Sequence, residues 1–461
     1  MRSNRNNAWN FNGNNGFANY NNNFYNRYRV LSLSNDDKGR HTRQMIELSD
    51  IVGAYLVARQ NKRRSADQTD FELHWEQGCV RLLQQVRQRA LRPTAYSFVA
   101  SRPKPREVFA SDMATRVMHH YLDIRLRPLM ERRLSSHTFN NRRGMGQKAC
   151  QNAVISDIYE MSEGYTRDAY IIKLDMSGCF PNIVQDIAYA KLREIVEQDY
   201  YGRDKDEVLY ILSSCIYSYP TEHCYRLSPL TKWADIAPAK SLYNKPAGIG
   251  AALGHLIWQN AVNVYFAEID EWMLSLPEIR YERYVDDFYV VTRDKRILAY
   301  LVPELRQRLA PLGAKLNEHK FYCQHWSKGV ECLGAHIKVA RVYVNNRVIR
   351  NCFQSIGVWP KASDKHIPAV ISSLNSYIGQ CKQCNGFRVA MKLWDAVPQA
   401  WKKYIYLDRD KWIVKALPGH TRREILTRKF NLISSKYGKS ARTKGENNRK
   451  DGSSPCDYGG K

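Results

Sequence analysis

The chain has 461 residues, enough for two or three subdomains, and its hydrophobic content of 44% supports a globular fold. A net charge of +26 and a pI near 9.6 indicate a polyanionic partner, most often nucleic acid. No apolar run approaches 18 residues and the polar start lacks a signal-peptide core, which excludes a membrane span and a secretory signal. The eleven scattered cysteines are expected to be reduced thiols.

The predicted elements begin after a segment rich in asparagine. Residues 1–40 are predicted to be disordered, since twelve of the first thirty residues are Asn. Apolar residues at helical spacing predict two helices within 44–92, and residues 93–110 are predicted to be extended. Ser111 is the expected cap of the helix that follows.

The remaining elements follow from periodicity and composition. We predict helices over 183–215, a loop-rich stretch over 218–246, one long helix over 252–275, strands within 332–349, helices over 363–430, and a basic flexible tail over 431–461.

Three carboxylates carry the chemistry. Tyr284-Val285-Asp286-Asp287 lies inside an apolar run, a pattern typical of two short strands joined by a tight turn. Asp175 ends another apolar, strand-like run. Adjacent carboxylates repel each other, and Mg²⁺, which prefers carboxylate oxygen, is the usual reason to keep them. Carboxylates converging from two strands would hold two ions for phosphoryl or nucleotidyl transfer.

Six blocks, in this order along the chain, resemble those of a reverse transcriptase. They are residues 102–109, 137–146, 173–181, 284–287, 312–320 and 332–337. The resemblance covers roughly residues 95–400 and implies an α+β, right-hand polymerase with fingers, a palm of antiparallel sheet backed by helices, and a helical thumb. The expected domains are 41–165 for the N-terminal helices and fingers, 166–345 for the palm with its insert at 218–246, and 346–430 for the thumb.

The resemblance implies roles for the acidic residues and one lysine. Asp175 and Asp286 are the expected ligands of a two-ion Mg²⁺ site, where Mn²⁺ is also possible, and Asp287 is the weaker, outer or primer-side carboxylate. Lys320 matches a late-palm lysine that either protonates the leaving pyrophosphate or pairs with phosphate.

Further positions match the family's dNTP-binding residues. Lys104, Arg106 and Arg142 are the expected cations for the triphosphate, with a generic solvated or RNA-facing charge as the alternative for each. Phe180 is the expected steric gate that excludes a 2′-OH, and a buried palm aromatic is the alternative.

The block before Tyr284 identifies a subclass. Leu253, Gly254 and Gln259, with the run 263–265, resemble reverse transcriptases of diversity-generating retroelements, whereas Trp258 departs from the Ser expected there. Leu253 replaces a Gln that would hydrogen-bond near the nascent base pair, unless it is simply a core residue.

The subclass implies a function and its partners. The enzyme would copy a template-repeat RNA into cDNA from a DNA primer and dNTPs, with errors at adenine, for mutagenic retrohoming. A small, basic, helical accessory protein is the expected protein partner, and a cytoplasmic, bacterial or phage-encoded protein is implied. The Asn-rich start is either translated from an overlapping template repeat or a disordered tail without that meaning.

Two alternatives stay open. One is a group II intron-like, retron or phage-defence (antiviral) reverse transcriptase of ordinary fidelity. The other, of a different class, is a catalytically inactive palm scaffold that only binds RNA; the intact Asp175, Asp286, Asp287 and Phe180 argue against it.

Overall fold

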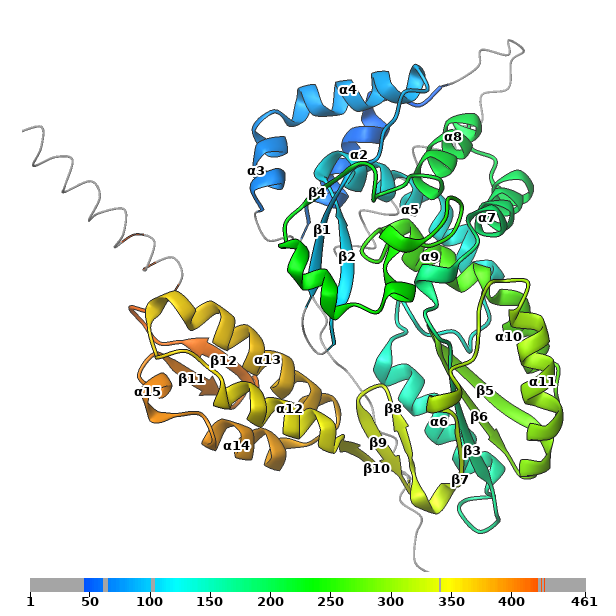
Figure 1. Ribbon diagram of the computed structural model, residues 1–461, viewed down its shortest axis with the longest axis vertical. Coiled ribbons are helices and arrows are strands. Elements are labelled where there is room, and N and C mark those ends of the chain that lie inside the picture. Colours follow the sequence, from blue (N-terminus) through cyan, green and yellow to red (C-terminus); the bar gives the residue numbers. More distant parts are fainter. Residues whose placement is uncertain are drawn as a thin grey trace, which may run out of the picture. The chain divides into compact units, whose positions relative to one another are not determined.

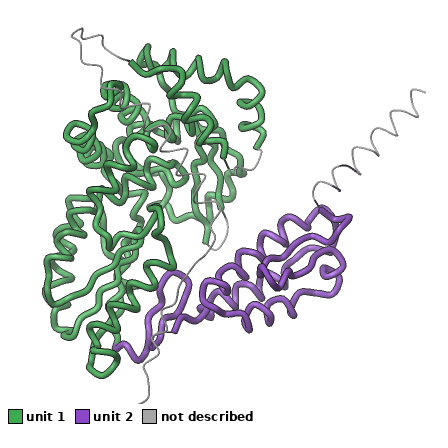
Figure 2. Tube along the Cα trace, turned by 180° about the vertical axis from the view of Figure 1, so that it is seen from behind, with its two compact units in different colours: residues 1–324 green, residues 325–461 purple. Residues whose placement is uncertain are grey.

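The computed structural model describes residues 45–60, 65–100, 104–339, 341–421, 424 and 427 (Figure 1). The chain divides into two compact units, Met1–Gln324 and His325–Lys461 (Figure 2). The predicted Asn-rich segment and the basic tail lie outside the described residues. Among the described residues, no helix combines the length and hydropathy needed to cross a bilayer.

The first unit begins with helices that pack around a long central helix. They are α2 (Leu48–Ala58), α3 (Ala66–Leu73), α4 (Trp75–Arg87) and α5 (Met113–Arg133). The prediction of two helices before residue 92 was wrong by one, because the chain breaks at His74. The predicted cap was also wrong: Ser111 ends a strand, and the side chain of Asp112 accepts the Thr115 amide at the start of α5.

A small sheet follows, with strand order β2-β1-β4. The strands β1 (Ala95–Ala100) and β2 (Arg106–Ser111) are antiparallel, which confirms the extended prediction, and β4 (Cys224–Arg226) joins β1 in parallel. Buried Glu107 ties the loop-rich insert to β2 by accepting hydrogen bonds from Trp233, Ser241 and Leu242 at 2.7–2.8 Å. This insert contains the short 3₁₀ helices η2 (Leu230–Asp235), η3 (Pro238–Lys240) and η4 (Leu242–Asn244).

The second sheet of this unit has strand order β5-β6-β3-β7. Its strands are β3 (Tyr170–Asp175), β5 (Ile279–Tyr284), β6 (Asp287–Thr292) and β7 (Tyr322–His325), and β6 is antiparallel to both β3 and β5. The helix α6 (Gln147–Met161) packs against β5 and β6. The expected antiparallel sheet backed by helices is therefore present.

Further helices complete the unit. They are α7 (Gln185–Asp199), α8 (Lys205–Ile216), α9 (Leu256–Tyr265), α10 (Ala267–Leu274) and α11 (Leu298–Leu309). The pair α7 and α8 confirms the prediction of helices over 183–215. The single long helix predicted over 252–275 was wrong, because the backbone at Phe266 leaves the helical conformation and separates α9 from α10. One hydrophobic core joins α2, α5, α9 and the sheet.

The second unit has its own core and two small antiparallel sheets. The strands are β8 (Val330–Cys332), β9 (Ala335–Lys338), β10 (Arg341–Val344), β11 (Ile405–Asp408) and β12 (Ile413–Ala416). The helices are α12 (Asn346–Gly357), α13 (Ile367–Gln383), α14 (Phe387–Asp395) and α15 (Gln399–Lys402).

Two expectations for this unit need correction. The predicted strands end at Val344, because Asn345 caps α12 by accepting the Arg347 amide. The prediction of helices over 363–430 missed the hairpin of β11 and β12. The α+β class is confirmed, whereas the finer domain limits at 40, 165, 345 and 430 stay predictions.

Candidate active site

Strand register brings the three predicted carboxylates to one end of the β3–β6 sheet. Asp175, the last residue of β3, pairs directly with Asp287, the first residue of β6. Asp287 also pairs with Tyr284 across the β5–β6 hairpin, which leaves Val285 and Asp286 as its two-residue tip. The Met176 amide donates to the Asp286 carbonyl oxygen at 2.9 Å, so the end of β3 is fixed against the tip.

Asp175 is buried and surrounded by donors. Lys320, in the 3₁₀ turn η6 (Glu318–Lys320), places Nζ 2.6 and 2.7 Å from the two carboxylate oxygens. Asn317 Nδ2 donates to the same carboxylate at 3.1 Å, and the Asn317 amide donates to the Asp175 carbonyl oxygen at 2.7 Å. The side chain of Lys320 is half exposed (52%), so this cation sits between the carboxylate and solvent.

The two hairpin carboxylates have less compensation. Lys173 Nζ lies 3.2 Å from Asp287 Oδ1, and burial raises the pKa of Asp287. Burial, followed by the charges of Asp287 and Asp175, raises the pKa of Asp286 to about 6. At Asp286, burial and the two like charges outweigh the nearby charge of Lys320.

The three carboxylates are chemically suitable ligands for a divalent cation. Oxygen ligands suit Mg²⁺ and Mn²⁺, and the mutual repulsion felt at Asp286 is what a bound cation would relieve. Among the described residues, no three acidic, His or Cys side chains are already gathered as ligands. Two of the three carboxylates have lysine partners instead: Asp175 pairs with Lys320 and Asp287 pairs with Lys173.

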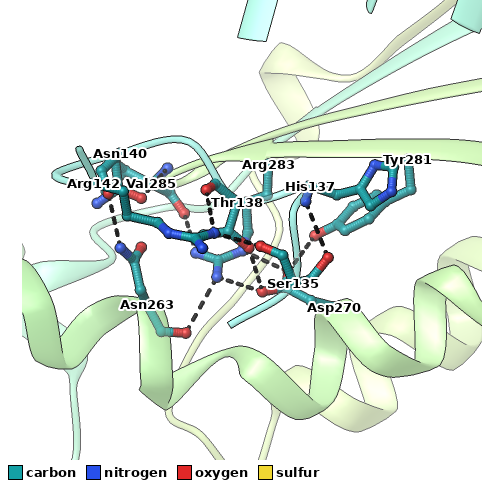
Figure 3. Close-up of polar contacts among 10 residues, drawn as sticks. All are labelled: Ser135, His137, Thr138, Asn140, Arg142, Asn263, Asp270, Tyr281, Arg283 and Val285. Carbon is teal, nitrogen blue, oxygen red and sulfur yellow. Dashed lines mark hydrogen bonds and ion pairs between the residues drawn. The ribbon is translucent and has the colours of Figure 1, made fainter. Parts of the chain in front are cut away.

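Two buried side chains, those of Asn140 and Arg283, hydrogen-bond to the hairpin tip at Val285 (Figure 3). Arg283 is fully buried and donates to Asp270 through Nε and Nη2, both at 2.6 Å. Its Nη1 donates to the Val285 carbonyl oxygen at 3.2 Å, and the Val285 amide donates to Asn140 Oδ1 at 3.3 Å. The tip is thus fixed by side chains from two separate parts of the chain.

The backbone of the predicted steric gate adjoins the subclass block. Phe180, at the start of η1 (Phe180–Asn182), is half-buried, and its carbonyl oxygen accepts the Ala251 amide at 2.8 Å. The Leu253 carbonyl oxygen accepts the Phe109 amide of β2 at 2.8 Å. Gly254 has a φ of +117°, and a Cβ there would lie 2.5 Å from the Phe109 carbonyl oxygen, so only glycine fits.

Two further residues of the block, Gln259 and Trp258, lie in the helix α9. Gln259 is half-buried in the helix. Trp258 is 1% exposed and belongs to the hydrophobic core, which accounts for an apolar residue where Ser was expected.

The predicted phosphate-binding cations fall into two groups. Lys104 and Arg106 are exposed. Arg106 is the first residue of β2, and Lys104 lies just before it. Arg142 instead points inward: Nε donates to Glu131 at 2.7 Å, and Nη1 donates to the carbonyl oxygens of Ser135 and Thr138. The structure does not bring Arg142 together with Lys104 and Arg106 in one open cationic surface.

Sequence reasoning missed four polar residues around the carboxylates: Lys173, Asn317, Asn140 and Arg283. Lys173 had a signal, because residues two apart on a strand share a face and Lys173 precedes Asp175 by two. Asn317 lies in a block singled out for Lys320. Asn140 meets the tip across 145 residues of sequence, so no local pattern indicates it. Arg283 lies only two residues before Val285, but its burial against Asp270 is a tertiary contact that no local pattern indicates.

Comparisons with known proteins agree with this geometry. The family described as "Reverse transcriptase (RNA-dependent DNA polymerase)" matches residues 103–337, just over half of the chain. None of the curated proteins compared matches the chain.

Solved telomerase structures resemble parts of the chain. They include apo telomerase from Candida tropicalis truncated from the C-terminal domain (14% identity, TM-score 0.40, 55% of each chain) and apo telomerase from Candida tropicalis (12%, 0.41, 67% of this chain and 56% of that one). Telomerase from Candida albicans in complex with a TWJ fragment of telomeric RNA is also similar (12%, 0.39, 70% and 60%). The chain spans less than two thirds of each of these proteins.

The family match covers all four strands of the β5-β6-β3-β7 sheet, the strands β2 and β4 of the small sheet, and all of the predicted site residues, the three carboxylates included. It also agrees with the α+β architecture expected of a right-hand polymerase. The chain therefore belongs to the reverse transcriptase (RNA-dependent DNA polymerase) family.

Proposed function

We propose that the protein is an RNA-directed DNA polymerase that extends a DNA primer on an RNA template with dNTPs. The observation that carries the proposal is the meeting of Asp175, Asp286 and Asp287 at one end of the β3–β6 sheet. Asp175 and Asp286 would hold Mg²⁺, with Asp287 beside them. The bound metal supplies charge neutralisation at the attacking and leaving oxygens.

The side chains around the carboxylates have separate roles. Lys320, already within hydrogen-bond reach of Asp175, is exposed enough to meet the leaving pyrophosphate and to donate a proton to it. Lys104 and Arg106 would bind the triphosphate. Arg142 would do so only by exchanging its bonds to Glu131 and Thr138.

Phe180 would act as the steric gate under the sugar. Its half-buried position beside the segment that contains Ala251 supports this role. We expect Phe180→Ala to admit rNTPs while Phe180→Tyr still excludes them, as measured by competition between dNTPs and rNTPs. Equal discrimination by all three proteins would contradict the assignment.

We further propose the diversity-generating subclass, with a template-repeat RNA as template, errors at adenine, and a small basic helical accessory protein as partner. The block around Leu253 supports this proposal. The Leu253 carbonyl oxygen accepts a hydrogen bond from the Phe109 amide of β2, and the Leu253 side chain is half-buried and apolar. An apolar residue offers the nascent base pair no hydrogen bond, so mispairs lose less binding energy than they would beside Gln.

The experiment is cDNA synthesis on an RNA containing all four bases, with the accessory protein present, followed by sequencing. We expect substitutions to concentrate opposite adenine, and Leu253→Gln to reduce them while the control Leu253→Met does not. Accurate cDNA from the parent would favour the intron-like, retron or phage-defence classes. RNA binding without any extension would favour the inactive scaffold.

A further inference from the structure

The hairpin tip contains a residue in an unfavourable conformation. Val285 has a φ of +56°, a left-handed conformation that is rare for any residue and a true outlier for a β-branched one. Two-residue hairpin tips usually place Gly, Asn or Asp at such positions. Val285 directly precedes Asp286, so its backbone conformation sets where that carboxylate points.

Two side chains satisfy both backbone groups of Val285 (Figure 3). Asn140 Oδ1 accepts the amide at 3.3 Å, and Arg283 Nη1 donates to the carbonyl oxygen at 3.2 Å. Asn140 is 5% exposed and Arg283 is fully buried. Strained residues persist where the surroundings over-determine them, and such sites cluster where function needs a fixed geometry.

Arg283 is itself held rigidly. The carboxylate of Asp270 accepts hydrogen bonds from Nε and Nη2, both at 2.6 Å, and the Asn263 carbonyl oxygen accepts a further one from Nη2 at 3.3 Å. Asp270 also accepts from the hydroxyls of Thr138 and Tyr281. A planar guanidinium with this many fixed partners has one orientation only.

Asn140 is held by an equally fixed segment. The Arg283 amide donates to His137 and the Phe139 amide donates to Arg283, which joins this segment to β5 in a parallel bridge centred on Thr138. Asn263 Nδ2 donates to the Asn140 carbonyl oxygen at 2.9 Å. The bonds of Arg142 to Ser135 and Thr138 brace the same segment from its other end.

We propose that Asn140 and Arg283 are positioning residues that hold Val285 in its left-handed conformation and thereby fix Asp286 beside Asp175 for metal binding. The inference rests on the proposed function, because it concerns the same metal site. The buried hydrogen bonds of Asn140 and Arg283 would then orient a metal ligand in addition to stabilising the core.

The test is a double-mutant cycle between Asn140→Ala and Val285→Gly. Glycine adopts positive φ without strain, so the acceptor at Asn140 matters less in the Gly background. We expect Asn140→Ala to weaken Mn²⁺ binding, measured by calorimetry, and to lower kcat for primer extension, each about tenfold, the equivalent of one buried hydrogen bond. In the Val285→Gly background the same change should cost less than about threefold.

Thr292→Val is the matched control. Thr292 is buried at the far end of β6 and donates to the carbonyl oxygens of Glu278 and Asp294. This variant should lower the Tm without changing Mn²⁺ affinity or kcat. Arg283→Ala is avoided because it leaves Asp270 buried and unpaired.

The outcomes separate cleanly. Equal losses from Asn140→Ala in both backgrounds, or no loss in the parent, would overturn the inference. If Asn140→Ala does not fold, recovery of folded protein in the double variant supports the inference and no recovery overturns it. A parent that neither binds Mn²⁺ nor extends a primer would instead refute the proposed function.

Discussion

Asp175 and Asp286 lie at the same end of one sheet, yet their electrostatic surroundings differ. Asp175 accepts two close contacts from Lys320 and one from Asn317. Burial, followed by the charges of Asp287 and Asp175, raises the pKa of Asp286 to about 6 although Lys320 opposes the shift. Asp175 thus has a close cationic partner in this structure, and we expect Asp286 to be the carboxylate that gains most from a bound cation.

The largest expected effect comes from removing the charge of Asp286. Asp286→Asn should reduce primer extension by about a thousandfold or more, since a principal metal ligand is lost. RNA binding, measured by filter binding at fixed salt, should stay within a factor of two because Lys and Arg side chains, rather than a carboxylate, neutralise backbone phosphates. Loss of RNA binding together with activity would show that the residue is structural.

The same pair of sites predicts stability changes of opposite sign. In the absence of metal, Asp286→Asn should raise the free energy of unfolding by about 1 kcal/mol, because a repelled, buried charge disappears. Asp175→Asn should lower it by about 1 kcal/mol, a figure discounted for the solvent exposure of Lys320. Urea unfolding of both variants and of the parent, without metal, measures these free energies. Changes of the same sign would contradict the proposed difference between Asp175 and Asp286.

Lys320 distinguishes a proton donor from a fixed charge. If it donates to pyrophosphate, Lys320→Arg should lower kcat about a hundredfold with little change in the dNTP KM, because guanidinium is a poor acid. Lys320→Gln should lose a similar amount in kcat. Full activity of the Arg variant would assign Lys320 to phosphate pairing alone.

The raised pKa of Asp286 predicts the pH dependence of metal use. A carboxyl group with a pKa near 6 holds its proton below that pH and competes with the cation for it. At subsaturating Mg²⁺ the rate should therefore rise about tenfold per pH unit up to about pH 6 and then level off. Raising Mg²⁺ should move the midpoint to lower pH; a midpoint independent of Mg²⁺ would contradict the assignment.

A second buried acidic pair, away from the proposed metal site, gives the smallest effect. Burial, with the nearby charge of Glu282, raises the pKa of Asp157 to about 8, although His137 opposes the shift. The stability contributed by this proton is present in full below about pH 3.8 and is lost as the pH rises through about 8.

Asp157→Asn should flatten that loss, by about 1 kcal/mol at pH 9, as measured by thermal unfolding across pH. Mg²⁺ should raise the Tm of this variant as it does for the parent. The same addition should leave Asp286→Asn unchanged. A Mg²⁺ effect that vanished in Asp157→Asn would mean that buried acidic groups in general, rather than Asp286, respond to the cation.

Local sequence patterns predicted the strands and the turn that contain the three carboxylates. Strand alternation and the Tyr-x-Asp-Asp turn gave β3, β5 and β6, and register then placed Asp175 opposite Asp287. Local patterns did not predict the direction of the Arg142 side chain. A long side chain turns inward or outward according to tertiary partners such as Glu131. The same reason accounts for Asn140, whose partner Val285 lies 145 residues away in sequence. Arg283 is close to Val285 in sequence, but the buried Asp270 that orients it is found only in the folded chain.

Element boundaries failed for a related reason. The apolar periodicity runs on through Phe266, yet the backbone breaks there. Asn345 caps α12 where only strands were expected, and β11 with β12 forms a hairpin inside a stretch that suited helices. Asn345 is a local capping signal that the strand prediction overlooked, since Asn is a favoured helix cap. The hairpin of β11 and β12 depends instead on pairing between two strands, which helical periodicity does not indicate.

The most direct measurement is primer extension on an RNA template with dNTPs and Mg²⁺, comparing the parent with Asp286→Asn at equal RNA occupancy. We expect Mg²⁺-dependent cDNA from the parent and none above background from the variant. Extension by Asp286→Asn at a rate comparable to the parent would contradict the central claim that Asp286 is where the metal is gained.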